Sequence, residues 1–208
     1  MGRKFLVATA GLGLALALHS AASAAIVNQF ASSVIGFSSE FSSTNWSAAQ
    51  ALGAPNTFAY GDLVTAWAPL PQNGTLEFIT VGFTLPVFAD GFVIRETYGN
   101  GFVYQVDVLD TANVLHTVWT GADPSPPGSP VDFTQAFTRT SFLVKGLKVY
   151  SDTNHNLGAW EEIDSIQLLG NTDPLVAAVP EPATASILGL GMLAFGLLRL
   201  RRRAVFPD

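Results

Sequence analysis

The fold of this chain is decided by Tyr104-Gln105-Val106-Asp107-Val108-Leu109, an alternating run that leads directly into Asp110-Thr111-Ala112-Asn113. In an extended strand, Val106 and Val108 point to one face and the polar residues between them point to the other. The Asp and Asn of the next four residues favour a tight turn. The stretch therefore predicts a β-strand that enters a hairpin.

Similar runs recur along the middle of the chain, and Val, Ile, Thr, Phe and Tyr dominate them, as pleated half-buried surfaces favour. They are Leu76–Phe83, Gly91–Tyr98, His116–Thr120, Asp132–Phe137, Phe142–Tyr150 and Ile163–Leu169. No strong amphipathic helix separates them. The pattern predicts an all-β fold, an antiparallel β-sandwich of the jelly-roll type.

The segments between these runs are rich in turn residues. Tyr98–Gly101 predicts a second tight hairpin, and Asp123–Pro130, with four prolines, predicts an exposed irregular loop. The Ser-rich stretch Ser32–Leu52 predicts irregular structure, apart from one helical turn over Ser47–Leu52 that Gly53 would cap.

The charge between the two chain ends is strongly acidic. From Ile26 to Val179 there are 4 basic and 14 acidic residues, a net charge of −10. Such a surface repels nucleic acid, so we exclude nucleic-acid binding; it suits neutral glycans, cationic partners or divalent metal. The chain has no cysteine, which excludes thiol catalysis, thiolate metal sites and redox chemistry.

Residues 1–24 predict a cleavable secretory signal peptide. Arg3 and Lys4 form a positive start, Phe5–Leu18 is apolar, and Ala22-Ser23-Ala24 supplies a small-residue cleavage site. The mature chain is expected to begin near Ala25.

The last thirty residues contain three signals in a fixed order. Pro180-Glu181-Pro182 is held extended by its prolines. The uncharged run Ala183–Leu198 predicts a single, short transmembrane helix. A cluster of arginines follows and places the C-terminus in the cytoplasm. This cluster consists of Arg199, Arg201, Arg202 and Arg203.

This order of signals resembles the PEP-CTERM sorting signal of exported proteins in Gram-negative bacteria. The resemblance implies an exosortase-type processing enzyme as partner, acting at or near the Pro-Glu-Pro motif. It divides the chain into an exported domain (25–171), a linker (172–179) and the sorting signal (180–203). It also implies an inner-membrane intermediate, then a cell-surface or extracellular product. The alternative is an ordinary C-terminal anchor that is never cut.

Several fragments of the exported domain resemble the galactose-binding-like, discoidin-type jelly roll. They include Ala48–Asn56, Gly61-Asp62 with Thr65 and Trp67, and Trp160–Leu168. Members of this fold mostly bind sugars on loops at one end of the sandwich, and many hold a structural calcium. The resemblance therefore implies that Asp62 and one of Glu161 or Glu162 are calcium ligands. The alternative is that Asp62 is a plain turn residue and the glutamates are solvated or salt-bridged.

Aromatic residues are the leading candidates for ligand binding. Trp46 lies in a polar segment and Trp160 follows a loop, so both are candidates to stack on sugar rings, with the loop residue His155 as a third candidate. The alternative is that both indoles fill the core of the sandwich. Trp67 and Trp119 are expected in the core. Glu162 and Asp164 would share one face of a strand, at a spacing that overlaps the separation of the two catalytic carboxylates in glycoside hydrolases. Both would come from one strand rather than flank a substrate from opposite sides, so a glycoside hydrolase is only a distant alternative.

The sequence as a whole predicts an exported, non-enzymatic protein of the cell envelope or extracellular matrix that binds glycan or exopolysaccharide through a β-sandwich. The alternative is a structural matrix protein without a small-ligand site.

Overall fold

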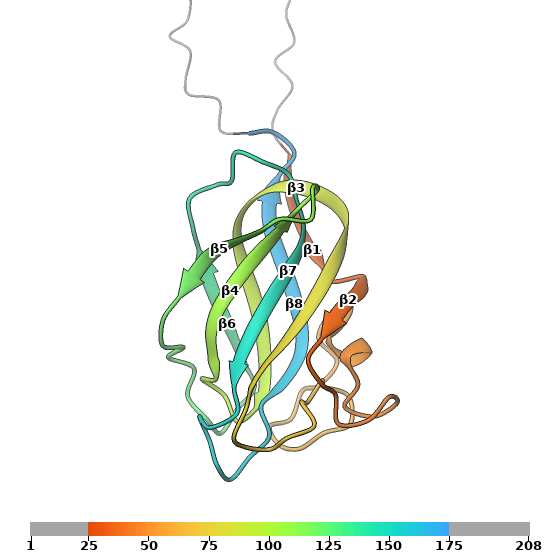
Figure 1. Ribbon diagram of the computed structural model, residues 1–208, viewed down its shortest axis with the longest axis vertical. Coiled ribbons are helices and arrows are strands. Elements are labelled where there is room, and N and C mark those ends of the chain that lie inside the picture. The colour runs from red at the N-terminus through yellow and green to blue at the C-terminus, as the bar shows by residue number, and fades with distance from the viewer. Residues whose placement is uncertain (1–24, 175–208) are drawn as a thin grey trace, which may run out of the picture.

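The computed structural model describes residues 25–174, and these form eight strands and one short 3-10 helix (Figure 1). The predicted signal peptide, Pro-Glu-Pro motif, transmembrane run and arginine cluster lie outside the described residues. The predicted all-β fold is confirmed. No helix within residues 25–174 has the length and apolarity needed to cross a membrane.

The elements follow one another along the chain with connections of very different length. Their bounds are β1 Ile26–Phe30, β2 Ser33–Phe37, η1 Ala48–Ala51, β3 Leu76–Tyr98, β4 Val103–Asp110, β5 Leu115–Thr120, β6 Val131–Ala136, β7 Val144–Asp152 and β8 Glu162–Asn171.

The strands form two antiparallel layers that share β3. One layer has the order β1-β8-β3-β6 and the other β2-β3-β7-β4-β5, with every neighbouring pair antiparallel. The first part of β3 pairs with β7 and its last part pairs with β8, so this strand crosses from one layer to the other. Figure 1 shows it arching over one end of the sandwich.

The crossing point of β3 is held by side chains of the segment after β6. The Thr140 hydroxyl accepts from the Ala89 N–H at 3.0 Å, and the Thr140 N–H donates to the Ala89 carbonyl at 2.8 Å. The Arg139 guanidinium lies 2.9 Å from the Asp90 carboxylate. The sequence predicted two separate strands here, and the structure corrects this to one bent strand of 23 residues.

The core fills the space between the two layers with side chains from alternate strand positions. Val106 and Val108 of β4 are both fully buried, as their alternation predicted. Other fully buried core residues include Trp67, Ile79, Val81, Phe92, Ile94, Leu147, Val149, Ile163, Ile166 and Leu168. Trp67 is thus in the core as expected, whereas Trp119 is partly buried and packs edge-on against Phe133.

One of the two predicted hairpins is present. β4 and β5 pair, and the Asp110 carboxylate accepts the N–H groups of Ala112 and Val114 at 2.8 and 2.9 Å. The prediction of a hairpin at Tyr98–Gly101 is wrong, because β4 pairs with β5 and β7 rather than with β3. The turn instead carries the chain from one layer to the other.

The Ser-rich segment is more ordered than its composition predicted. It contains β2, which pairs with the first part of β3, and the helical turn η1. The turn was predicted, but Leu52 rather than Gly53 is its C-cap, and Gly53 follows with a φ of 83°.

The two ends of the described domain lie side by side. Ile26 of β1 is paired with Asn171 of β8, and the Thr172 N–H donates to the Ala25 carbonyl at 3.1 Å. β8 begins at the other end of the sandwich, roughly 30 Å away for a strand of this length. The loops that precede β3 gather at that second end (Figure 1).

Candidate functional site

The candidate site is built from three segments that backbone hydrogen bonds hold together. The segment 64–68 forms an antiparallel β-bridge to β8. The Trp67 N–H donates to the Ile163 carbonyl at 2.8 Å, and the Ile163 N–H donates to the Trp67 carbonyl at 3.0 Å. The Trp67 indole is fully buried and donates to the Ser39 carbonyl at 3.2 Å. Trp67 thereby ties the loop after β2 to the start of β8.

Further backbone bonds position the first loop. The Phe41 N–H donates to the Ala68 carbonyl at 2.9 Å, and the Trp46 N–H donates to the Val64 carbonyl at 3.1 Å. The Ala68 N–H in turn donates to the Trp46 carbonyl at 3.2 Å. These three bonds fix the backbone beneath two aromatic side chains, so the rings are held in place before any ligand arrives.

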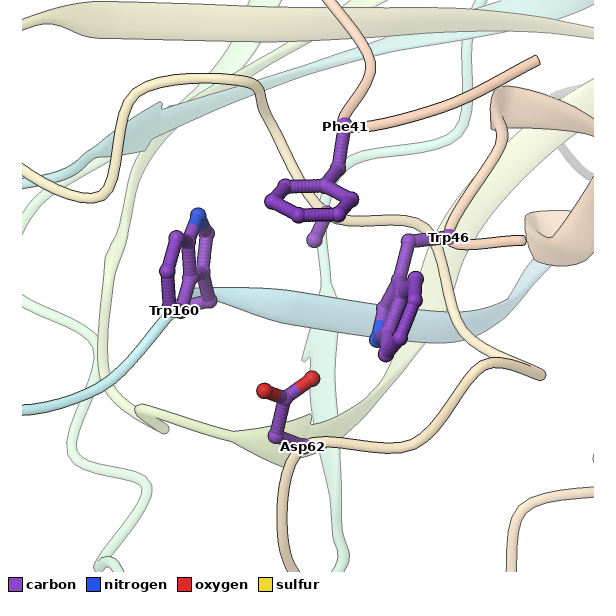
Figure 2. A pocket seen from close by; sticks show the side chains of 5 residues that line it. Phe41, Trp46, Asp62 and Trp160 are labelled. Carbon is purple, nitrogen blue, oxygen red and sulfur yellow. The ribbon is translucent and has the colours of Figure 1, made fainter. Parts of the chain in front are cut away.

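A pocket opens between these segments, with a cavity volume of about 60 Å³, and its lining is mostly aromatic. The lining residues are Phe41, Trp46, Asp62, Ala68 and Trp160. Figure 2 shows the two indoles on opposite sides, Phe41 above them, and the Asp62 carboxylate directed into the space between them. The structure therefore brings together two of the predicted ligand-binding residues and one of the predicted calcium ligands.

The three rings have a defined geometry. Phe41 meets Trp46 at 5.2 Å between ring centroids and 70° between planes, and meets Trp160 at 5.6 Å and 84°. Both are edge-to-face contacts, which aromatic pairs prefer. Both indole nitrogens are buried, and neither meets the geometry of a hydrogen bond, although the Trp46 indole lies close enough to Glu162 to lower the pKa of that carboxyl group. The pocket therefore offers aromatic surface and one carboxylate, while both indole nitrogens are shielded from solvent.

Trp46 has a strained backbone. Its φ of 51° lies in the left-handed region, which bulky residues seldom adopt. Such strain persists only where the surroundings impose it, and it gathers at ligand sites. Here the surrounding backbone bonds impose it and turn the indole toward the pocket.

Glu162 lies behind Asp62 at the start of β8 and is fully buried. Burial raises the pKa of Glu162 to about 9, and the neighbouring Asp62 carboxylate adds to the rise. The Leu63 N–H, 3.3 Å from the Glu162 carboxyl group, opposes it. Glu162 is therefore held in its neutral form at pH 7, and Asp62 is the exposed carboxylate of the pocket.

Glu161 points away from this pair. Burial raises the pKa of Glu161 to about 8, the Asn156 N–H lowers it and the charge of Asp152 raises it, so its surroundings are those of the β7–β8 loop. The structure thus brings Asp62 to Glu162 and not to Glu161. Within residues 25–174 no three His, Cys, Asp or Glu side chains are placed to hold a metal ion.

Calcium takes six to eight oxygen ligands, so a site at Asp62 and Glu162 would depend largely on backbone carbonyls and water. The donor types fit calcium, but two carboxylates leave most of its ligands to be supplied by other groups. Calcium binding at these two residues stays a prediction.

Asp164 has a structural role. Its carboxylate accepts the backbone N–H groups of Asn56 and Thr57, each at 3.1 Å, and the residue is 1% exposed. Its hydrolase partner Glu162 is equally buried. The two carboxylates therefore hold the loop that covers β8 rather than facing a substrate.

His155 lies apart from the pocket. It is exposed in the β7–β8 loop, with its ring against Gly101, where a Cβ would come within 2.7 Å of the imidazole Nε2. Phe41, in contrast, lines the pocket and was not predicted. Its signal in the sequence is a large apolar side chain inside a run of Ser and Glu, at 43% exposure in the fold.

Comparison with known families gives one match that spans most of the chain. Residues 19–178 match the family described as pappalysin-1, SD scarf domain, C-terminal. The chain belongs to this family. No curated protein matches the sequence.

Solved structures show what the fold of this SD scarf domain is similar to. A chain in the crystal structure of reduced XRCC1 bound to the DNA polymerase beta catalytic domain aligns with a TM-score of 0.55 at 13% identity, over 71% of this chain and all of the other. A chitosan-binding module from a Paenibacillus sp. IK-5 chitosanase/glucanase aligns with a TM-score of 0.48 at 15% identity, over 64% of this chain and 91% of the module. A family 32 carbohydrate-binding module of C. perfringens NanJ, solved with galactose, aligns with a TM-score of 0.46 at 11% identity, over 69% of this chain and 93% of the module.

Proposed function

We propose that this SD scarf domain is an exported, non-enzymatic carbohydrate-binding domain with a galactose-binding-like jelly roll, and that its aromatic pocket binds the sugar. One observation carries the proposal. Trp46 and Trp160, which are far apart in sequence, stand on opposite sides of one open pocket with a carboxylate between them (Figure 2).

The chemistry of the pocket suits a sugar ring. The C–H face of a pyranose is apolar and packs against an indole, while its hydroxyl groups need hydrogen-bond partners at the ring edge. Asp62 supplies a charged acceptor, which makes the stronger kind of hydrogen bond.

The place of the pocket supports a binding role at the cell surface. It lies at one end of the sandwich, and the chain enters and leaves the described domain at the other end. If the tail is a PEP-CTERM sorting signal processed by an exosortase, a chain held at Pro180-Glu181-Pro182 would present the pocket outward. The product would then be an envelope or matrix protein that holds exopolysaccharide.

Glycan binding is tested by changing one pocket ring. We expect Trp160→Ala to weaken binding of the best array glycan at least tenfold, about 1.4 kcal/mol. The control is Phe58→Ala, which removes an aromatic ring that is 77% exposed and outside the pocket. It should leave affinity unchanged, and both variants should keep the melting temperature within a few degrees. Equal affinity of Trp160→Ala and wild type would contradict the proposal, and no binding to any glycan would favour a purely structural matrix protein.

The sorting part is tested separately by the intact mass of the exported protein. We expect a chain that starts near Ala25 and ends near Pro180-Glu181-Pro182, without the arginine cluster. A mass that retains Arg199–Arg203 would show that the tail is an uncut anchor.

A further inference from the structure

Within residues 25–174 the charge of the pocket has no counter-ion. The four basic residues of the described chain are all engaged away from it. Arg95 pairs with Asp132 at 3.0 Å, Arg139 pairs with Asp90 at 2.9 Å, Lys145 donates to Asn113 at 2.6 Å, and Lys148 lies 3.8 Å above the Phe78 ring. Asp62 therefore presents an uncompensated carboxylate to whatever enters the pocket.

The aromatic walls favour the same sign of charge. The faces of Trp, Tyr and Phe rings carry negative potential, and a cation near a ring face gains about 0.5 to 2 kcal/mol, most with Trp. Here two indoles and a phenyl ring surround the space into which the carboxylate points (Figure 2). Rings and carboxylate together select a cation and disfavour an anion.

The size of the space sets a further limit. A cavity of about 60 Å³ is far smaller than the roughly 300–1,000 Å³ of pockets that enclose a whole ligand, so it takes up part of a sugar unit while the rest of the ring lies over the mouth. The side chain bordering the mouth beside both indoles is Phe41, which is 43% exposed and available to carry it. The substituent that enters must then be small and positively charged.

We propose that the pocket recognises a sugar unit with a free, protonated amine, whose ammonium group enters between the indoles and pairs with Asp62. The inference rests on the proposed glycan binding and specifies its ligand class. Acetylation of the amine would remove the charge and add an acetyl group to a cavity with little room. A uronic acid would bring a second carboxylate against Asp62, and the repulsion between the two carboxylates would disfavour its binding.

The test compares two matched ligands on the exported protein by calorimetry at pH 6 with EDTA present. One is a fully deacetylated glucosamine hexamer and the other is its fully N-acetylated counterpart. We expect the deacetylated hexamer to bind at least tenfold more tightly. Asp62→Asn should abolish this preference, and Trp160→Ala should weaken binding of the deacetylated hexamer.

A polycation also attracts an acidic protein without any pocket, so a charge-matched control is needed. Asp132→Asn removes the same charge from a side chain that is 53% exposed and outside the pocket. It should keep the tenfold preference. Loss of the preference in Asp132→Asn as in Asp62→Asn would overturn the inference in favour of general attraction, and so would a preference that survives in Asp62→Asn.

Failure of the inference and failure of the proposed function give different results. If N-acetylated or neutral glycans bind through Trp160 and the amine adds nothing, carbohydrate binding stands and the amine preference is wrong. If no glycan binds, both are wrong.

Discussion

Buried carboxylates decide much of the local structure, and Asp164 is the clearest case. It is 1% exposed and accepts two backbone N–H groups from the loop at residues 56–57. A buried N–H that loses its acceptor costs about 1–3 kcal/mol. The residue type alone suggested catalysis, whereas its partners show that it anchors a loop.

We therefore expect Asp164→Ala to lower the free energy of unfolding by about 2–4 kcal/mol, since two donors lose one acceptor. Asp132→Ala is the matched control: it removes an exposed carboxylate from an ion pair and should cost at most about 1 kcal/mol. Urea denaturation of both variants measures the difference. Equal losses would show that Asp164 does not anchor the loop.

Single residues also show how far sequence reasoning reaches in the site. Trp46 and Trp160 could be singled out because each lies in or after a polar loop, where a large ring has no evident core to fill. Their meeting could not be predicted, because it depends on the bridge between Trp67 and Ile163. Phe41 was missed for the same reason: only the backbone bond to Ala68 places it beside the indoles.

Strand β3 shows what periodicity can and cannot reveal about an element. Its two halves were predicted as strands because each alternates, and both halves are in the sheets. The alternation holds no information on whether the chain continues through Pro86 or turns there. The bend depends on Thr140 and Arg139, some fifty positions away in sequence. β1 and β2 were missed because they are edge strands of five residues each, too short to show a clear alternation.

Close approach of β3 and β7 gives a prediction at this scale. Gly146 faces Gly82, and a Cβ on Gly146 would lie 2.7 Å from the Val81 carbonyl oxygen. Gly146→Ala should therefore push the two strands apart and destabilise the fold by about 1–3 kcal/mol.

Gly36→Ala is the control for this effect, because Gly36 also lies in a strand but has no atom within 4 Å of its added methyl group. Its cost should stay within about 0.5 kcal/mol. Thermal unfolding of the two variants tests the prediction, and equal melting temperatures would contradict it.

Across the whole molecule, three fully buried glutamates couple the stability of the fold to pH. Burial raises the pKa of Glu161 to about 8, that of Glu162 to about 9 and that of Glu96 to about 10. The Asp123 carboxylate contributes to the rise for Glu96. Asp123 and Ser125 are buried, although the sequence predicted that their loop is exposed and irregular.

The sign of the pH dependence follows from these raised values. The folded state keeps these three glutamates protonated at pH values above about 4.5, where the unfolded chain has released the protons. Their contribution to the free energy of unfolding is therefore fully present below about pH 4.5 and is lost as the pH rises through 8 to 10. We expect the melting temperature to fall from pH 5 to pH 9. Glu96→Gln, which stays neutral, should make this fall smaller. A melting temperature that rises over this interval would contradict the prediction.

The neighbouring ends of the described domain have a consequence for its connectivity. The Ala25 N–H donates to the Thr172 hydroxyl at 3.2 Å, so a linker of a few residues would join the two ends without disturbing β1 or β8. New ends could then open in the exposed turn at Thr111-Ala112, between β4 and β5. A circular permutant of this kind should fold with the same pocket, and the intact domain should tolerate insertion into a surface loop of a host protein.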